Sequence, residues 1–149
     1  MRAEKNRAPV RLALAATAAA AALVRRATLL DPHLVRTASG IALVYTARHG
    51  FADPIRVLRT GGVYQSATYL GSRCMEPVFE YYRAFGRVFD MRPDARRVLA
   101  IGGGGFAFPK LVAARHPGTH TDVVEIDPAI TRLARERFFL DECLERTGA

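Results

Sequence analysis

Four consecutive glycines at positions 102–105 constrain the fold of this chain more than any other feature. They follow a short unbroken apolar run, residues 98–101, which is typical of a strand buried on both faces of a sheet. Residues 108–115 then favour a helix, with Pro109 in its first turn and residues 117–118 (Pro-Gly) beyond its end. The order strand, glycine loop, helix indicates the beginning of an α/β unit.

A second apolar run, residues 123–126, contains an acid, Glu125, 20 positions after Gly105. Pro128 opens another predicted helix, whose inward positions are Ile130, Leu133, Ala134 and Phe138. A glycine loop lets backbone approach a ligand closely, and the following helix presents unpaired N–H groups. A carboxylate at the end of the next strand can accept hydrogen bonds from both hydroxyls of a ribose. We therefore predict a nucleoside site in which Glu125 holds the ribose.

The glycine spacing alone leaves the nucleoside open. Gly102, Gly104 and Ala107 satisfy the pattern GxGxxA, which is typical of dinucleotide sites. The segments AIGGGGFAFP and VVEIDP, however, resemble the spermidine and spermine synthases, in which a GGGDGG loop and a strand ending in EID have the same spacing. The upstream segment GGVYQSATYL resembles a Gly-x-x-Gln element of that family's N-terminal β-domain. The resemblance covers roughly residues 41–140.

This resemblance implies both a fold class and a set of binding residues. The implied fold is α/β, with a small N-terminal antiparallel β-domain followed by the first part of a Rossmann-like, methyltransferase-type parallel sheet. By position, the glycines would line the cofactor, Glu125 would hold its ribose, Ile126 would touch adenine, and Gln65 would lie in the nucleoside or amine pocket. The implied cofactor-binding set is Gly102, Gly103, Gly104, Gly105, Glu125, Ile126 and Gln65.

The activity implied by the resemblance is transfer of an aminopropyl group from decarboxylated S-adenosylmethionine to a small-molecule amine. Gly105 stands where the family has a loop Asp that contacts the aminopropyl end, which implies an altered substrate. Two alternatives stay open: an S-adenosylmethionine-dependent methyltransferase of the same fold, and a non-catalytic remnant or interaction module.

No residue of this chain matches the family's catalytic Asp, which lies on a later strand. The sequence ends at Ala149, after the second helix of the predicted sheet. Two parallel strands leave unpaired edges. We therefore expect either that the chain is a truncated product or that something else completes the sheet. A homo-oligomer stays open as a separate expectation.

Residues 31–95 favour a β-meander plus a helix, and residues 96–149 the partial nucleoside-binding domain. Predicted strands are 41–46, 55–58 and 63–69, each rich in β-branched or aromatic residues or alternating in polarity. Helical spacing begins at Pro77, and an apolar stripe follows at intervals of three, four and three residues. We predict this stripe, which consists of Val78, Tyr81, Phe85 and Val88, to face the core.

Residues 1–30 contain an Ala-rich run, residues 12–24, between basic residues. Thirteen helical residues rise only about 20 Å, short of the roughly 30 Å hydrocarbon core of a bilayer. The run has the length of a secretory h-region, and the alternative is a plain Ala-rich helix. We expect a cytoplasmic protein, with membrane association through residues 12–24 as the alternative.

Charge and cysteine content argue against two other classes of function. The formal net charge is +8, but the basic residues are scattered and no nucleic-acid motif accompanies them, so we predict no nucleic-acid partner. Cys74 and Cys143 lie far apart and match no zinc-ligand spacing. We therefore predict no metal site.

Overall fold

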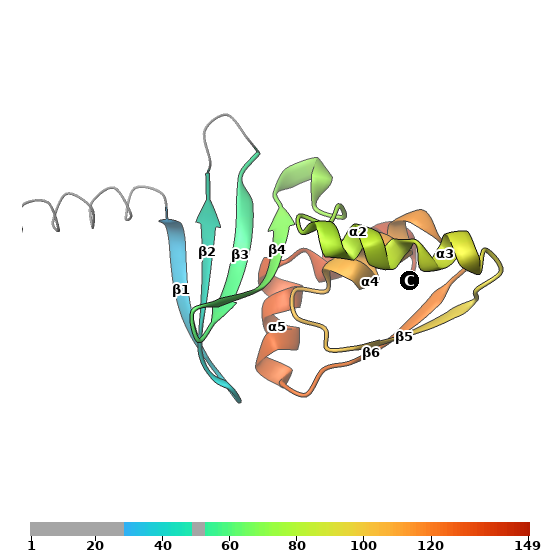
Figure 1. Ribbon diagram of the computed structural model, residues 1–149. Helices are drawn as coiled ribbons and strands as arrows, with labels where there is room; N and C mark the ends of the chain where they lie inside the picture. Colours follow the sequence, from blue (N-terminus) through green and yellow to red (C-terminus); the bar gives the residue numbers. More distant parts are fainter. Residues whose placement is uncertain (1–28, 49–52) are drawn as a thin grey trace, which may run out of the picture.

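The computed structural model describes residues 29–48 and 53–149 and contains two sheets, shown in Figure 1. The Ala-rich run 12–24 lies outside the described residues. The antiparallel sheet has the order β1-β2-β3-β4 and the parallel sheet pairs β5 with β6. The strands are β1 (Leu29–Thr37), β2 (Gly40–Ala47), β3 (Ile55–Thr60), β4 (Val63–Tyr69), β5 (Arg97–Ile101) and β6 (His120–Val124). The helices are η1 (Gly71–Arg73), α2 (Glu80–Gly86), α3 (Val88–Met91), α4 (Ala107–Arg115), α5 (Pro128–Arg137) and α6 (Leu140–Thr147).

The parallel sheet confirms the α/β prediction. β5, the glycine loop, α4, β6 and α5 follow one another in the predicted order. β6 begins three residues earlier than predicted and ends at Val124, so Glu125 and Ile126 come directly after the strand. This end of β6 lies beside the end of β5, because Ile101 pairs with Val124 in the parallel register.

The antiparallel sheet has one strand more than the predicted three-stranded meander. β1 pairs with β2 through the tight turn between Thr37 and Gly40. The pairing shifts between Leu30 and His33, and Asp31 in this irregularity has a positive φ of 53°. An Asp-Pro pair is typical of turns, which is why the sequence pattern did not indicate a strand here.

The main core lies between the antiparallel sheet and α5. Figure 1 shows this helix between the two sheets. The predicted inward face of α5 is confirmed, since Ile130, Leu133, Ala134 and Phe138 are all buried. These side chains bury apolar surface that neither element could bury alone. One cluster combines side chains of β2, β3 and the α5 region: Ala42, Val44, Leu58, Ile130, Leu133 and Phe138.

Polar contacts hold α5 against the antiparallel sheet at both helix ends. At its start, the Asp127 carboxylate accepts the backbone N–H of Ala38 in the β1–β2 turn. At its end, Arg137 lies 3.3 Å from a carboxylate oxygen of Asp31 in β1, and Arg56 of β3 donates to the Arg137 carbonyl at 3.1 Å. The antiparallel sheet is therefore linked to α5 at both ends of this helix.

Lys110 of α4 makes a third polar contact with the antiparallel sheet, and its side chain is buried, with 1% exposed. Its Nζ donates to Thr68 Oγ1 of β4 at 3.1 Å, to the Cys74 carbonyl at 2.8 Å, and to the Phe138 carbonyl. The three donors of an ammonium group are thus all used. Burial lowers the pKa of Lys110 to about 8, because desolvation disfavours the charged form.

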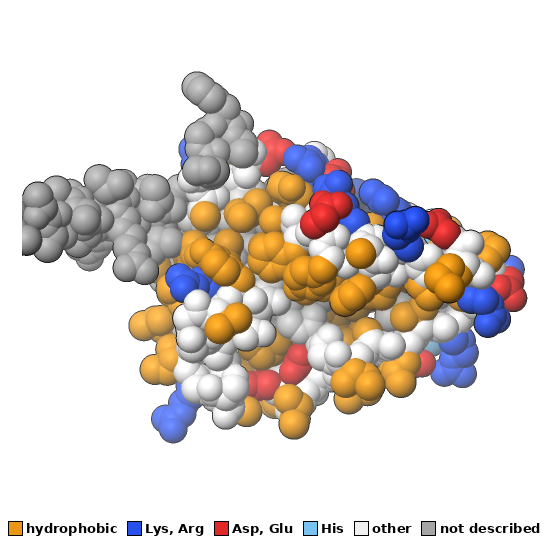
Figure 2. Space-filling view, viewed as in Figure 1, with side chains coloured by type: hydrophobic (Ala, Val, Ile, Leu, Met, Phe, Trp, Pro, Cys, Tyr) orange, Lys and Arg blue, Asp and Glu red, His pale blue; other side chains and the backbone are white. Residues whose placement is uncertain are grey.

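The predicted inward stripe after Pro77 is correct for Val78, which packs against a core cluster of the antiparallel sheet, and wrong for its other three residues. The helix is divided at Arg87 into α2 and α3, and Tyr81, Phe85 and Val88 are 45%, 54% and 43% exposed. The aromatic rings instead pack against one another: Tyr81 stacks on Phe79 with ring centroids 5.7 Å apart and lies tilted against Tyr82 at 4.1 Å. Figure 2 shows apolar side chains gathered over this part of the surface.

One face of the parallel sheet is also exposed. Leu99, Ile101 and Val124 point to this face and are 63%, 85% and 57% exposed. Parallel sheets are ordinarily covered on both faces. In the part of the chain that the structure describes, helices cover only the other face.

Replacing Lys110 tests how much its contacts between α4, β4 and the end of α5 stabilise the fold. We expect Lys110→Met to lower the free energy of unfolding by about 2–4 kcal/mol, because three oxygen acceptors lose the Nζ donor, although the Cys74 carbonyl keeps the Thr68 hydroxyl. Arg115→Met on the same helix removes an exposed charge and should change stability by less than about 0.5 kcal/mol. Urea unfolding of both variants measures the difference, and equal stabilities would contradict the role of Lys110.

The lowered pKa of Lys110 also predicts a pH dependence. Between pH 8 and the unfolded value of about 10.4, the unfolded chain binds a proton that the folded chain does not. The contribution of Lys110 to the unfolding free energy therefore rises with pH in this window. Between pH 7.5 and 9.5, the wild type should gain about 2 kcal/mol relative to Lys110→Met in urea unfolding. A difference that stays constant with pH would show that Lys110 titrates normally.

Candidate functional site

The glycine loop has an open end and a packed end. At Gly102, φ is +88° and an added Cβ would meet no atom within 4 Å, so a ligand could approach the backbone there. At Gly105, an added Cβ would lie 2.6 Å from Ser66 Oγ and 2.9 Å from Phe138 Cδ1. Gly105 therefore faces β4 and the core, and a side chain such as the Asp expected from the resemblance does not fit there without a shift of these neighbours.

Glu125 reaches back from the end of β6 to the glycine loop. Its Oε2 accepts the backbone N–H groups of Gly103 at 2.8 Å and Gly104 at 3.1 Å, and its Oε1 accepts the N–H of Asp127 at 3.0 Å. Burial of the carboxylate opposes ionisation, but the three N–H groups outweigh it and hold the pKa of Glu125 below its ordinary value. Glu125 is therefore ionised at neutral pH and sets the shape of the loop.

Asp127, two residues further, is a structural acid that the sequence analysis did not identify. It is 6% exposed, and its Oδ1 accepts the N–H of Ala129 at 2.9 Å, which makes it the N-cap of α5. An Asp directly before a first-turn Pro is a recognisable N-cap signal. The two acids of the EID segment thus have separate partners: Glu125 holds the loop and Asp127 holds the helix.

Gln65 lies at an irregularity of β4 next to the loop. Leu58 pairs with Ser66 and Arg59 with Tyr64, so Gln65 is the unpaired residue of a β-bulge. A bulge redirects side chains, and bulges are frequent beside active sites. The Gln65 carbonyl lies 3.8 Å from the position that a Cβ would take at Gly104, while its side chain is exposed. The backbone of Gln65 therefore lies next to the loop, while the predicted role of its side chain in a nucleoside or amine pocket stays a prediction.

Ile126 completes the group at the carboxyl ends of the parallel strands. It is 91% exposed and directly follows Glu125. Ligands of open α/β sheets bind at this edge, outside the carboxyl ends of the strands. Gly102, Glu125 and Ile126 all lie there, whereas Gly103 and Gly105 are buried.

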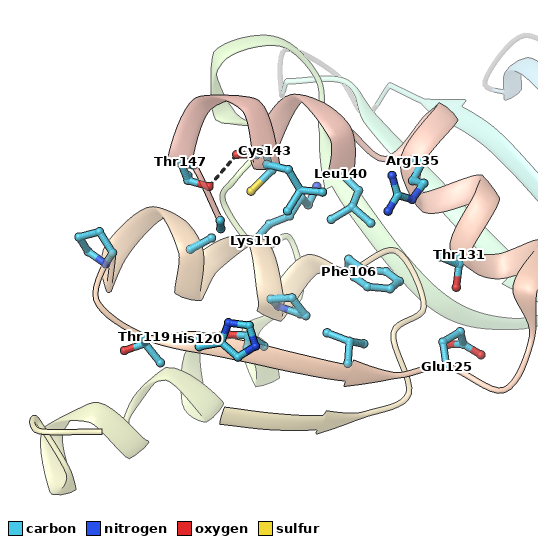
Figure 3. A pocket seen from close by; sticks show the side chains of 18 of the residues that line it. Phe106, Lys110, Thr119, His120, Glu125, Thr131, Arg135, Leu140, Cys143 and Thr147 are labelled. Carbon is cyan, nitrogen blue, oxygen red and sulfur yellow. Dashed lines mark hydrogen bonds between the residues drawn. The ribbon is translucent and has the colours of Figure 1, made fainter. Parts of the chain in front are cut away.

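A separate pocket of about 650 Å³ lies on the helix side of β6, shown in Figure 3. Helices α4, α5 and α6 surround it, and its lining includes Phe106, Lys110, Thr131, Arg135 and Leu140. Glu125 lies at one end of this pocket, but no residue of 102–105 lines it. Of the predicted site residues, the pocket therefore contains only Glu125.

Within residues 29–48 and 53–149, no three His, Cys, Asp or Glu side chains lie close enough together to hold a metal ion. Among the helices described, none combines the length and hydropathy that crossing a bilayer requires.

Comparison with known proteins shows similarities in sequence and in fold. No family model matches the chain. The chain is 35% identical over 83 residues to a polyamine aminopropyltransferase of Vibrio vulnificus, covering 54% of this chain and 27% of the relative. Its fold is similar to the crystal structure of a probable spermidine synthase from Corynebacterium glutamicum, with a TM-score of 0.57 and 23% identity over 71% of this chain and 39% of the other. The chain is therefore spermidine synthase-like in sequence and fold, and it spans about a quarter to two fifths of the length of these proteins.

A substitution at Gly105 tests the packed end of the loop. We expect Gly105→Ala to lower the free energy of unfolding by about 1–3 kcal/mol, because the new Cβ overlaps Ser66 and Phe138. The matched control is Gly86→Ala in α2, where the Cβ would meet Leu111 at an ordinary 3.8 Å. That variant should be neutral or more stable by about 0.5–1 kcal/mol, since alanine favours a helix. Thermal or urea unfolding compares the two, and equal effects would contradict the packing described for Gly105.

Proposed function

We propose that this chain provides the nucleoside-binding part of an aminopropyltransferase-like enzyme that uses decarboxylated S-adenosylmethionine and a small-molecule amine. The observation that carries the proposal is the contact between Glu125 and the glycine loop at the carboxyl ends of β5 and β6. The similarity to a polyamine aminopropyltransferase supports this choice of chemistry, and the bulge that places Gln65 beside the loop supports the predicted pocket.

In this proposal the described residues bind and position the reactants. Glu125 holds the ribose, Ile126 contacts adenine, and Gln65 faces the nucleoside or the amine. The nitrogen of the amine attacks the methylene carbon next to the sulfonium, the carbon–sulfur bond breaks with its electrons going to sulfur, and methylthioadenosine leaves. The sulfonium supplies the reactivity, and the protein supplies orientation. We assign no described residue as the base that takes the proton of the amine.

A second candidate function is an S-adenosylmethionine-dependent methyltransferase. Gly105 provides no carboxylate to attract a cationic aminopropyl group, and a Cβ does not fit at this position. The first turn of α4 has no side-chain cap, so its free N–H groups and the helix dipole favour an anion. The carboxylate that distinguishes S-adenosylmethionine from its decarboxylated form suits this environment.

Calorimetry on the full chain with methylthioadenosine and the two sulfonium compounds tests the proposal. We expect methylthioadenosine to bind, because it contains the adenosine that the site would recognise. Tighter binding of the decarboxylated compound supports aminopropyl transfer, whereas tighter binding of S-adenosylmethionine supports the methyltransferase. Failure of all three to bind refutes both functions.

A substitution at Ile126 tests the adenine contact without disturbing the core. We expect Ile126→Ser to weaken methylthioadenosine binding about three- to tenfold, because an apolar contact with the base is lost. The stability should change little, since this side chain is 91% exposed. Ile41→Ser in β2 removes another exposed isoleucine, which is 64% exposed, and should leave binding unchanged. Equal affinities of the two variants would place adenine elsewhere.

A further inference from the structure

Cys74 and Cys143 are the only two cysteines of the chain, and the structure brings them together. Both are free, buried thiols, and with Met75 they form one buried cluster, although they lie far apart in the sequence. Neither belongs to the predicted nucleoside site. The pair therefore forms a second cluster of reactive groups, separate from the glycine loop.

The Cys74 thiol lies against helix α6, which carries Cys143. Its sulfur donates to Glu142 Oε1 at 3.8 Å and accepts from Arg146 Nη1 at 3.8 Å. Glu142 directly precedes Cys143, and Arg146 follows it by about one helical turn. The Cys74 sulfur therefore lies beside the turn of α6 that contains Cys143. Burial raises the pKa of Cys143, and negative charge on Cys74 adds to this shift, as expected for two sulfurs that are close in space.

The backbone at both cysteines is held by hydrogen bonds that do not involve the sulfurs. The Cys74 carbonyl accepts from Lys110 Nζ at 2.8 Å. The Cys143 N–H donates to the Phe139 carbonyl at 3.0 Å, and the Cys143 carbonyl accepts from the Thr147 hydroxyl at 2.8 Å. We therefore expect the sulfurs to meet by rotation of the two side chains, with both backbone segments in place.

We propose that Cys74 and Cys143 are an oxidation site, at which a small hydroperoxide converts the two thiols into a disulfide. Cys143, unlike Cys74, lines the pocket of about 650 Å³ shown in Figure 3. A peroxide that enters this pocket therefore reaches the Cys143 sulfur first. Cys74 is then the resolving thiol, because its sulfur lies next to the same turn of α6.

The reaction takes place in two steps, with hydrogen peroxide as the oxidant. In the first, the Cys143 thiolate attacks one peroxide oxygen and the oxygen–oxygen bond breaks. The hydroxide that leaves takes up the thiol proton as water, and Cys143 becomes a sulfenic acid. In the second, the Cys74 sulfur attacks the sulfenic sulfur and displaces hydroxide, which receives the Cys74 proton through the Glu142 carboxylate. The two thiols lose two electrons in total, and the peroxide becomes two waters.

The disulfide joins the segment after β4 to α6. Both parallel strands and the glycine loop lie between the two cysteines in the sequence, so the bond closes a long loop around them. A cross-link over a long loop stabilises a protein chiefly by restricting the unfolded chain. The oxidised chain should therefore unfold at a higher urea concentration than the reduced chain.

Mass spectrometry of the full chain after peroxide treatment tests the site. We expect the folded chain to lose two hydrogen atoms, to form no bond between chains, and to take up no iodoacetamide until dithiothreitol restores both thiols. Its urea midpoint should rise on oxidation and return on reduction. Sulfinic acid on Cys143 with Cys74 still free, a disulfide between two chains, or no reaction of the folded chain would each overturn the proposal.

A displaced thiol provides a matched control. The double variant Cys143→Ser with Glu145→Cys carries its second thiol at an exposed position of α6. Circular dichroism checks that this variant is folded. We expect no disulfide within the folded variant under conditions that oxidise the wild type. Equal yields in the two proteins would show that any two thiols of this chain can meet, which contradicts a specific site.

A second pair of variants tests the proton path through Glu142. Glu142→Gln removes the carboxylate that accepts the Cys74 hydrogen bond. The disulfide should then form several times more slowly, and sulfinic acid on Cys143 should accumulate, because the sulfenic acid waits longer for the resolving thiol. Glu145→Gln makes the same chemical change at another position of α6 and should preserve the wild-type rate. Equal rates for these two variants would overturn the role of Glu142.

Discussion

The carboxylate of Glu125 joins the ends of the two parallel strands. It comes directly after β6 and accepts two N–H groups of the loop that follows β5. Four glycines in succession have many accessible conformations, so their backbone needs an external partner to adopt one. The ionised Glu125 is that partner, and its bonds to Gly103 and Gly104 leave the preceding Gly102 as the open end of the loop. The candidate site exists because these strands end side by side.

A second set of contacts places β4 next to the glycine loop. Lys110 links α4 to β4 and to the end of α5, and Asp127 links the start of α5 to the β1–β2 turn. These contacts hold β4 against the glycine loop, with Ser66 packed on Gly105 and the Gln65 bulge next to Gly104. The antiparallel sheet thus forms one wall of the site. Lys110 needs three oxygen acceptors because its charge is buried, which explains why three separate segments meet at one side chain.

Several elements could be predicted because their signals are local. Pro128 after Asp127, the apolar run before the glycines and the helical spacing of Ile130, Leu133 and Phe138 each determine structure within a few residues. Two predictions were less successful. β1 was missed because its irregularity contains a turn-like Asp-Pro pair, and Tyr81 and Phe85 were placed in the core because helical spacing indicates an apolar face without showing what covers it. Only the packed structure shows that these two rings meet edge to face.

The sequence by itself determined the order of strand, glycine loop, helix, strand and acid, and with it the position of Glu125 at the sheet edge. Backbone propensities and hydrophobic periodicity act over short distances, so this information is present in the linear chain. The tertiary structure alone decided that the oxygens of Glu125 are occupied by loop amides, that Gly105 faces Ser66 and that Lys110 is buried. These properties depend on contacts between residues up to 42 positions apart, such as Lys110 and Thr68, and distances of this kind are set by packing.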